Sequence, residues 1–167
     1  MKILLVLKHW QIFIMMVGTV LLTEIFFLDQ IISGLESFNV FLAILMFAMA
    51  CYLLWIWSIA ILVSKKYKVG NVQALLWFKV FYVEILSYFT IGILSRFHLP
   101  FTDIGFEVMH LPTILFLLFC IFCAARIMRS AEFGSDRLSE CFGDFFLLWF
   151  YPIGIWIIQP RLNKLMK

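Results

Sequence analysis

The chain has 167 residues, of which 65% are hydrophobic and 14% charged, and its formal net charge is +3. Soluble domains are nearer to about 45–50% apolar and about 25% charged residues, so this composition excludes a single soluble globular domain. The small positive charge does not indicate a nucleic-acid partner, and the lipid bilayer is the predicted solvent for much of the surface. We therefore predict one all-α membrane domain over residues 1–167.

The first apolar segment predicts a transmembrane helix over about residues 10–28. A helix needs about 20 apolar residues to cross a bilayer. Trp10 lies at its start, where aromatic residues favour the membrane boundary. Glu24 lies about one turn from its far end, from which it can reach headgroups or water. We interpret this segment as an uncleaved span, because Lys8 and His9 interrupt the early apolar run and no small-residue cleavage site follows.

The second predicted span covers residues 40–63 and contains no charged residue. The loop that follows it, residues 64–73, carries Lys65, Lys66 and Lys68. Lysine and arginine are enriched in short cytoplasmic loops, so this loop is the strongest cytoplasmic marker in the chain.

The third predicted span, residues 74–95, contains two ionisable side chains, Lys79 and Glu84. A charge facing lipid near the midplane costs at least about 2.5–3.5 kcal/mol. Lys79 lies near the cytoplasmic end, where its long stem can carry the ammonium to the interface. Glu84 lies near the middle, so we expect it to face other helices. It is either a neutral acid that hydrogen-bonds to Tyr88, Tyr82 or a neighbouring helix, or part of a proton relay or polar path.

The fourth predicted span covers residues 111–128 and ends among arginines. Cys120 and Cys123 form a CxxC motif on it, a spacing with which membrane oxidoreductases exchange electrons with a quinone. The motif is expected near the cytoplasmic, reducing side and has no second cysteine pair in a loop. We therefore interpret both cysteines as small hydrophobic side chains, with a membrane thiol redox protein as an alternative.

Two polar segments flank this span. The loop before it contains Glu107 and His110, whose ExxH spacing can supply two metal ligands on a helix. One such pair is a weak signal, so we predict solvated loop residues and no metal site. The ionisable residues of this loop are His98, Asp103, Glu107 and His110.

The linker over residues 130–144 is either solvated or a docking surface for a soluble partner. Its charged patch consists of Asp136, Arg137 and Glu140, next to Arg126 and Arg129.

The tail over residues 145–159 is apolar but short for a span, and Pro152 and Gly154 interrupt it. Such a segment is typical of a re-entrant or interfacial helix. A fifth crossing would also place the basic end of the chain outside, against the positive-inside rule. We therefore predict a four-helix membrane bundle with both termini cytoplasmic, and keep five spans as the alternative.

The sequence of this tail, WFYPIGIWIIQPRLN from Trp149 to Asn163, resembles the C-terminal signature of a group of uncharacterised small polytopic bacterial inner-membrane proteins. The resemblance implies a bacterial inner-membrane location and no particular activity. Trp149 and Trp156 are seven residues apart, so we expect them to share a helix face at the interface. We expect the polar exit of the tail to bind headgroups or cap other helices; its residues are Gln159, Pro160, Arg161 and Asn163.

The chain contains no phosphate-binding loop, nucleophile elbow or HExxH motif. We therefore predict no catalytic residue and no cofactor. The favoured function is a non-enzymatic assembly or accessory subunit that associates with itself or with a membrane or cytoplasmic protein. The alternative is an oligomeric channel or pore-forming effector with a polar path around Glu84; the path candidates are Glu84, Lys79, Tyr88 and Glu24.

Overall fold

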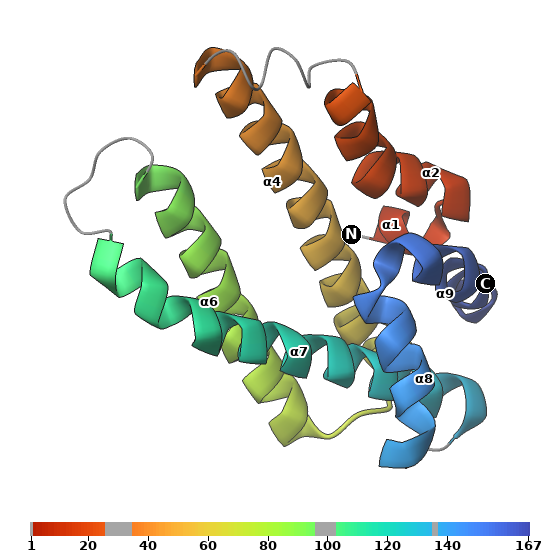
Figure 1. The fold of residues 1–167 in the computed structure, drawn as a ribbon. Coiled ribbons are helices and arrows are strands. Elements are labelled where there is room, and N and C mark those ends of the chain that lie inside the picture. Colours follow the sequence, from red (N-terminus) through yellow and green to blue (C-terminus); the bar gives the residue numbers. More distant parts are fainter. Residues whose placement is uncertain (1, 26–34, 96–102, 135–136) are drawn as a thin grey trace.

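The computed structural model of the chain describes all residues except 1, 26–34, 96–102 and 135–136 (Figure 1). The described residues form helices, and none of them lies in a strand. The elements are α1 Lys2–Val6, α2 His9–Phe13, η1 Ile14–Gly18, α4 Leu35–Ser58, η2 Ile59–Val63, α5 Ser64–Tyr67, α6 Val72–Ser95, α7 Asp103–Phe133, α8 Leu138–Trp149 and α9 Tyr151–Met166. The π-helical turns η1 and η2 lie inside longer helices, so the first long helix runs from His9 to Ile25 and the second from Leu35 to Tyr67.

Three helices are long and apolar enough to cross a membrane: Ala43–Tyr67, Val72–Gly92 and Val108–Phe133. The pair α8 and α9 meets the same test only if it is counted as one span, and it is bent by 118° at Phe150. The structure therefore contains three such helices, or up to four, in its described residues. The described residues confirm the predicted all-α class, with three or up to four helices long and apolar enough to span a membrane.

The first predicted span is described only as far as Ile25, and His9–Ile25 is shorter than a full crossing. Residues 26–28 of that prediction lie outside the described residues.

At the other end of the chain, the helix boundaries differ from those of the predicted linker and tail. Helix α7 continues to Phe133, and α8 begins at Leu138, within the predicted linker. The reason is that Cys141, Asp144 and Leu148 recur at helical spacing and form the buried face of α8.

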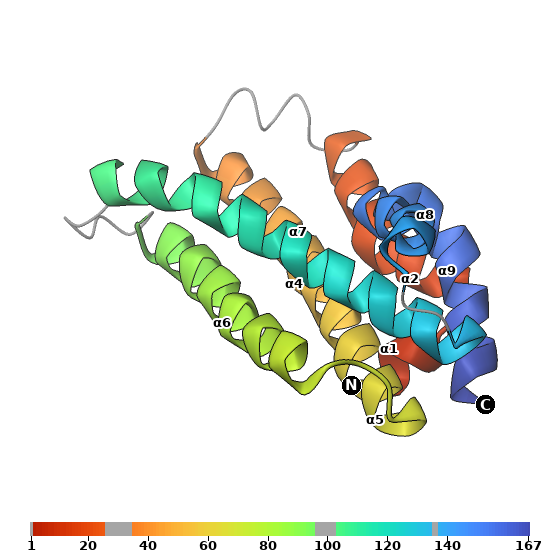
Figure 2. The ribbon, with the colours of Figure 1, turned by 90° about the horizontal axis from the view of Figure 1, so that it is seen from below.

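The helices pack around one core to which all the long elements contribute. Helix α7 contacts α6 along one part of its length and α8 along another, while α9 contacts α1 and α2 (Figures 1 and 2). Small side chains on the buried face of α7, among them Ala124 and Ala125, allow this close approach. Large fully buried side chains fill the remaining space, including Trp55, Phe78 and Met128.

Helix α6 is the least covered of the long helices. In an apolar 18-residue window of Val72–Gly92 only 22% is buried within the chain, against 50% for the corresponding window of Ala43–Tyr67. One side of α6 packs on α7, where the rings of Phe81 and Phe116 stack with centroids 4.3 Å apart. Among the described residues, no other helix buries the opposite side, which carries Lys79, Ser87 and Thr90 among mostly apolar side chains. Lipid or another chain must therefore cover that side.

Candidate functional site

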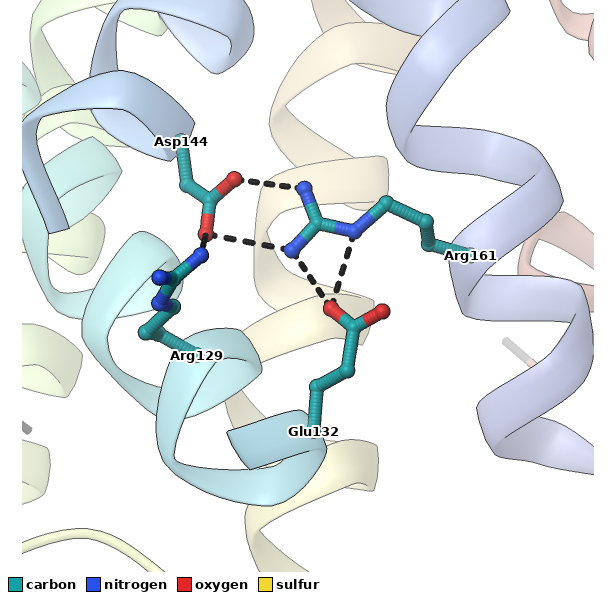
Figure 3. Close-up of polar contacts among 4 residues, drawn as sticks. All are labelled: Arg129, Glu132, Asp144 and Arg161. Atoms are coloured by element: carbon teal, nitrogen blue, oxygen red, sulfur yellow. Dashed lines mark hydrogen bonds and ion pairs between the residues drawn. The ribbon is translucent and has the colours of Figure 1, made fainter. Parts of the chain in front are cut away.

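The most concentrated group of charges in the described residues joins three helices near the end of the bundle at which α7 stops. The guanidinium of Arg161, on α9, lies between Glu132 of α7 and Asp144 of α8 (Figure 3). Its Nε donates to Glu132 Oε2 at 2.8 Å, and its Nη1 donates to Asp144 Oδ1 at 2.5 Å. Arg129 adds a longer contact, with its Nη1 3.9 Å from Asp144 Oδ2. We call these four residues the charged cluster.

The charged cluster is largely removed from solvent, which explains its geometry. The side chain of Asp144 is 5% exposed and that of Arg161 is 21% exposed. Burial lowers the pKa of Arg161, but the hydrogen bonds to Asp144 and Glu132 outweigh burial, so the net pKa is raised and the side chain stays charged. A planar guanidinium can donate to both carboxylates at once, which a lysine in the same place could not do with the same geometry.

Arg161 was predicted to lie in the polar exit of the tail, but its carboxylate partners were not predicted. The structure turns the guanidinium of Arg161 inward, onto Glu132 at the end of α7 and Asp144 in the middle of α8. One signal in the sequence could have found Asp144: it lies three residues after Cys141 and four before Leu148, on the apolar face of its helix. A carboxylate on a buried helix face requires a cationic partner, but the spacing does not identify which arginine supplies it.

A second buried group fastens the tail to the N-terminal helices. Gln159 is fully buried, and its Nε2 donates to the carbonyl oxygens of Leu4 and Leu7, both at 2.9 Å. Its Oε1 accepts a hydrogen bond from Trp55 Nε1 at 2.9 Å, and Asn163 Nδ2 donates to the Leu7 carbonyl at 3.2 Å. Because α1 ends at Val6 and α2 begins at His9, the carbonyls at this break lack the partners that a continuous helix would supply. Gln159 and Asn163 supply donors to them.

The prediction that Trp149 and Trp156 share one helix face is wrong. The chain turns by 118° at Phe150, so the two tryptophans lie on different helices. Trp156 packs against the first long helix, with its ring centroid 4.7 Å from that of His9. Trp149 packs within α8, with its ring centroid 5.6 Å from that of Phe145.

The turn at Phe150 depends on Pro152 and Gly154. Pro152 lies in the first turn of α9, where its missing N–H is not needed. Gly154 is buried, and a Cβ placed on it would overlap the carbonyl oxygen of Leu147 and lie 2.5 Å from its carbonyl carbon. The backbones of α8 and α9 are therefore in direct contact, and only glycine fits at this contact.

The four polar-path candidates are not gathered in one place. Glu84 is half-buried between α6 and α7, and its Oε1 accepts a hydrogen bond from Thr113 Oγ1 at 3.1 Å. Its Oε2 is buried without a hydrogen-bond partner among the described residues. Tyr88 instead pairs its hydroxyl with His110 Nδ1 at 2.5 Å. Lys79 is exposed about 140° around α6 from Glu84, given 3.6 residues per turn.

Glu24 is exposed near the described end of the first long helix, so it is also separate from Glu84. Lys79 and Glu84 do not line a common path within one chain, because they point to different sides of α6.

The remaining predicted residues divide as follows. All four cysteines are buried, and Cys120 Sγ lies 3.7 Å from the carbonyl oxygen of Phe78. Arg137 and Glu140 form an exposed ion pair at 4.0 Å. His98, Asp136 and the side chains of Asp103 and Glu107 lie outside the residues that the structure describes. Within the described part of the chain, no group of three or more His, Cys, Asp or Glu side chains could hold a metal ion.

Comparison with protein-family models, curated proteins and solved structures found no match for this chain. Function is therefore inferred from its own geometry. The charged cluster and the group around Gln159 both hold the tail against other helices, so they fix the bend between α8 and α9. The uncovered side of α6 is the large surface that these internal contacts do not use.

Proposed function

We propose that this chain is a small integral membrane protein that works as a non-enzymatic assembly subunit, and that it associates with a second membrane-spanning chain through α6. The single observation that carries the proposal is the uncovered side of α6. We call it the outer face of α6; its residues are Leu76, Lys79, Val83, Leu86, Ser87 and Thr90, all exposed.

The polar side chains of the outer face suit contact with another helix. Ser87 Oγ donates to the carbonyl of Val83 at 2.9 Å, and Thr90 Oγ1 donates to that of Leu86 at 2.8 Å. Both hydroxyls are therefore satisfied within α6, and both residues are small. Helices in membranes pack through such small residues, because lipid tails are as apolar as leucine and give no hydrophobic drive for association.

Light scattering on the purified protein in mild detergent tests the proposal. We expect a protein mass larger than the 19.7 kDa of one chain, from a second copy or from a co-purified membrane protein. Ser87→Phe places a large ring on the outer face and should reduce that mass to one chain. Leu115→Phe is the matched control, because Leu115 is 57% exposed on α7, away from the outer face. A single-chain mass for the unmodified protein, at every concentration in the mild detergent, would contradict the proposal.

We propose a topology in which the tail enters the membrane without crossing it and both termini are cytoplasmic. The support is that the end of α9 lies beside the lysine-rich loop. Lys66 Nζ and Tyr67 Oη donate to the carbonyl of Leu165 at 2.6 and 2.7 Å. If the loop is cytoplasmic, as its lysines indicate, the end of α9 lies on the same side. The resemblance of residues 149–163 supports a bacterial inner membrane as the location.

Cysteine labelling in whole cells tests the topology. The four native cysteines are buried and should give a low background. We expect Lys68→Cys and Lys167→Cys to react with a membrane-impermeant maleimide only after the cells are permeabilised. Ser33→Cys, in the acidic connection after the first predicted span, is the exterior control and should react in intact cells. Labelling of Lys167→Cys in intact cells would show that the tail crosses the membrane.

A further inference from the structure

We propose that a pocket between the start of α6 and the C-terminal half of α7 binds the phosphate group of a phospholipid. The pocket has a volume of about 90 Å³. Its lining includes Gly70, Asn71, Ala74, Cys123, Arg126 and Ser130. It is separate from the charged cluster and from the outer face of α6, so the inference goes beyond the proposed function.

The wall formed by the link between α5 and α6 is held in place by its own contacts. Ser64 Oγ donates to the carbonyl of Val69 at 2.6 Å. Gly70 has a φ of +100°, which favours glycine, and a Cβ on it would lie 3.4 Å from Cγ1 of Ile127. The link therefore packs directly against α7 and defines one side of the pocket (Figure 1).

The polar lining has the chemistry that binds phosphate. Arg126 and Ser130 are four residues apart on α7, so they lie on the same face of the helix. A guanidinium can donate two parallel hydrogen bonds to phosphate oxygens, and a serine hydroxyl can add a third donor. Glu132 on α7 and Asp144 on α8, two acids near this end of α7, both accept hydrogen bonds from Arg161. Their charge is therefore compensated within the charged cluster.

The location of the pocket favours a lipid as the source of the phosphate. Arg126 lies near the end of the fourth predicted span, at the height of the lysine-rich loop, where Lys65 and Lys68 are exposed. Basic pockets between membrane helices at this level bind anionic headgroups. Leu75 and Ile127 also line the pocket and give it an apolar side, which an acyl chain could cover.

Thermal unfolding of the full chain in detergent tests the inference, with short-chain phosphatidylglycerol and inorganic phosphate as separate probes. We expect phosphatidylglycerol to raise the Tm, because a ligand that binds only the folded state stabilises it. Arg126→Gln removes the guanidinium and should abolish the increase. Ala74→Leu keeps every charge and fills the pocket, so it should abolish the increase as well.

Arg137→Gln is the charge-matched control, because the Arg137 side chain is 81% exposed and does not line the pocket. It should retain the full increase. If inorganic phosphate raises the Tm as much as the lipid, with the same dependence on Arg126 and Ala74, the site binds phosphate but its source is free phosphate rather than lipid. The inference is overturned if neither probe raises the Tm, or if the increase survives in both Arg126→Gln and Ala74→Leu.

Discussion

Gly154→Ala is expected to destabilise the protein by about 3 kcal/mol or more, the upper part of the range for overpacked sites. The added Cβ would overlap the carbonyl oxygen of Leu147, which is backbone and cannot move aside as a flexible side chain can. Helices α8 and α9 would have to separate at their bend. That separation would also weaken the hydrogen bond of Gln159 to the N-terminal helices and that of Arg161 to Glu132 on α7.

Thermal unfolding in detergent measures this effect, and Gly143→Ala provides its control. Gly143 is exposed within α8, and a Cβ on it would meet nothing within 4 Å. Alanine is favoured over glycine in a helix by about 0.5–1 kcal/mol, so Gly143→Ala should leave the Tm unchanged or raise it. Equal Tm values for the two variants would show that α8 and α9 are not in direct backbone contact.

Arg161→Gln is expected to destabilise the protein by about 3–5 kcal/mol, as when one partner of a buried ion pair is removed. The substitution leaves Asp144, which is 5% exposed, with only the longer contact to Arg129 at 3.9 Å. Glu132 loses both of its hydrogen bonds from Arg161. The expected result is therefore a large loss in the free energy of unfolding, measured by denaturation in mixed micelles.

Two further variants separate this effect from a general loss of charge. Arg137→Gln removes an arginine from an exposed pair and should change the free energy of unfolding by less than about 1 kcal/mol. The double variant Arg161→Gln with Asp144→Asn removes the unpaired carboxylate as well, so it should be more stable than Arg161→Gln alone. If the two substitutions simply add their separate losses, Arg161 and Asp144 do not interact as Figure 3 shows.

The long apolar runs made the central helices predictable from the sequence. The predicted span 74–95 matches α6, which begins at Val72 and ends at Ser95, because a long and mostly apolar segment can satisfy its backbone in lipid only as a helix. The sequence predicted that the helix of the tail is interrupted, but not the residue at which it ends. Pro152 has no N–H to donate to the carbonyl four residues earlier, so α8 cannot continue through it and ends at Trp149, ahead of the proline.

The partners of the polar side chains could not be predicted, because they depend on how the helices pack. Arg161 and Glu132 are 29 residues apart in sequence, and Gln159 and Leu4 are 155 apart. Helical spacing identifies which residues share a face, but it does not state which face meets another helix. Glu84 illustrates this limit: the sequence left Tyr88, Tyr82 and a neighbouring helix open as its hydrogen-bond partner, and the partner is Thr113 on the neighbouring helix α7.

Site-specific photo-crosslinking in native membranes tests the central claim, association through the outer face of α6, most directly. A photoreactive phenylalanine analogue at Val83, which is 59% exposed, should give a protein adduct of discrete mass. The same analogue at Leu115, which is 57% exposed on α7, should react mainly with lipid. Protein adducts at Val83 but not at Leu115 are the result that we predict. Reaction of Val83 with lipid alone, at the same level as Leu115, would contradict assembly through α6.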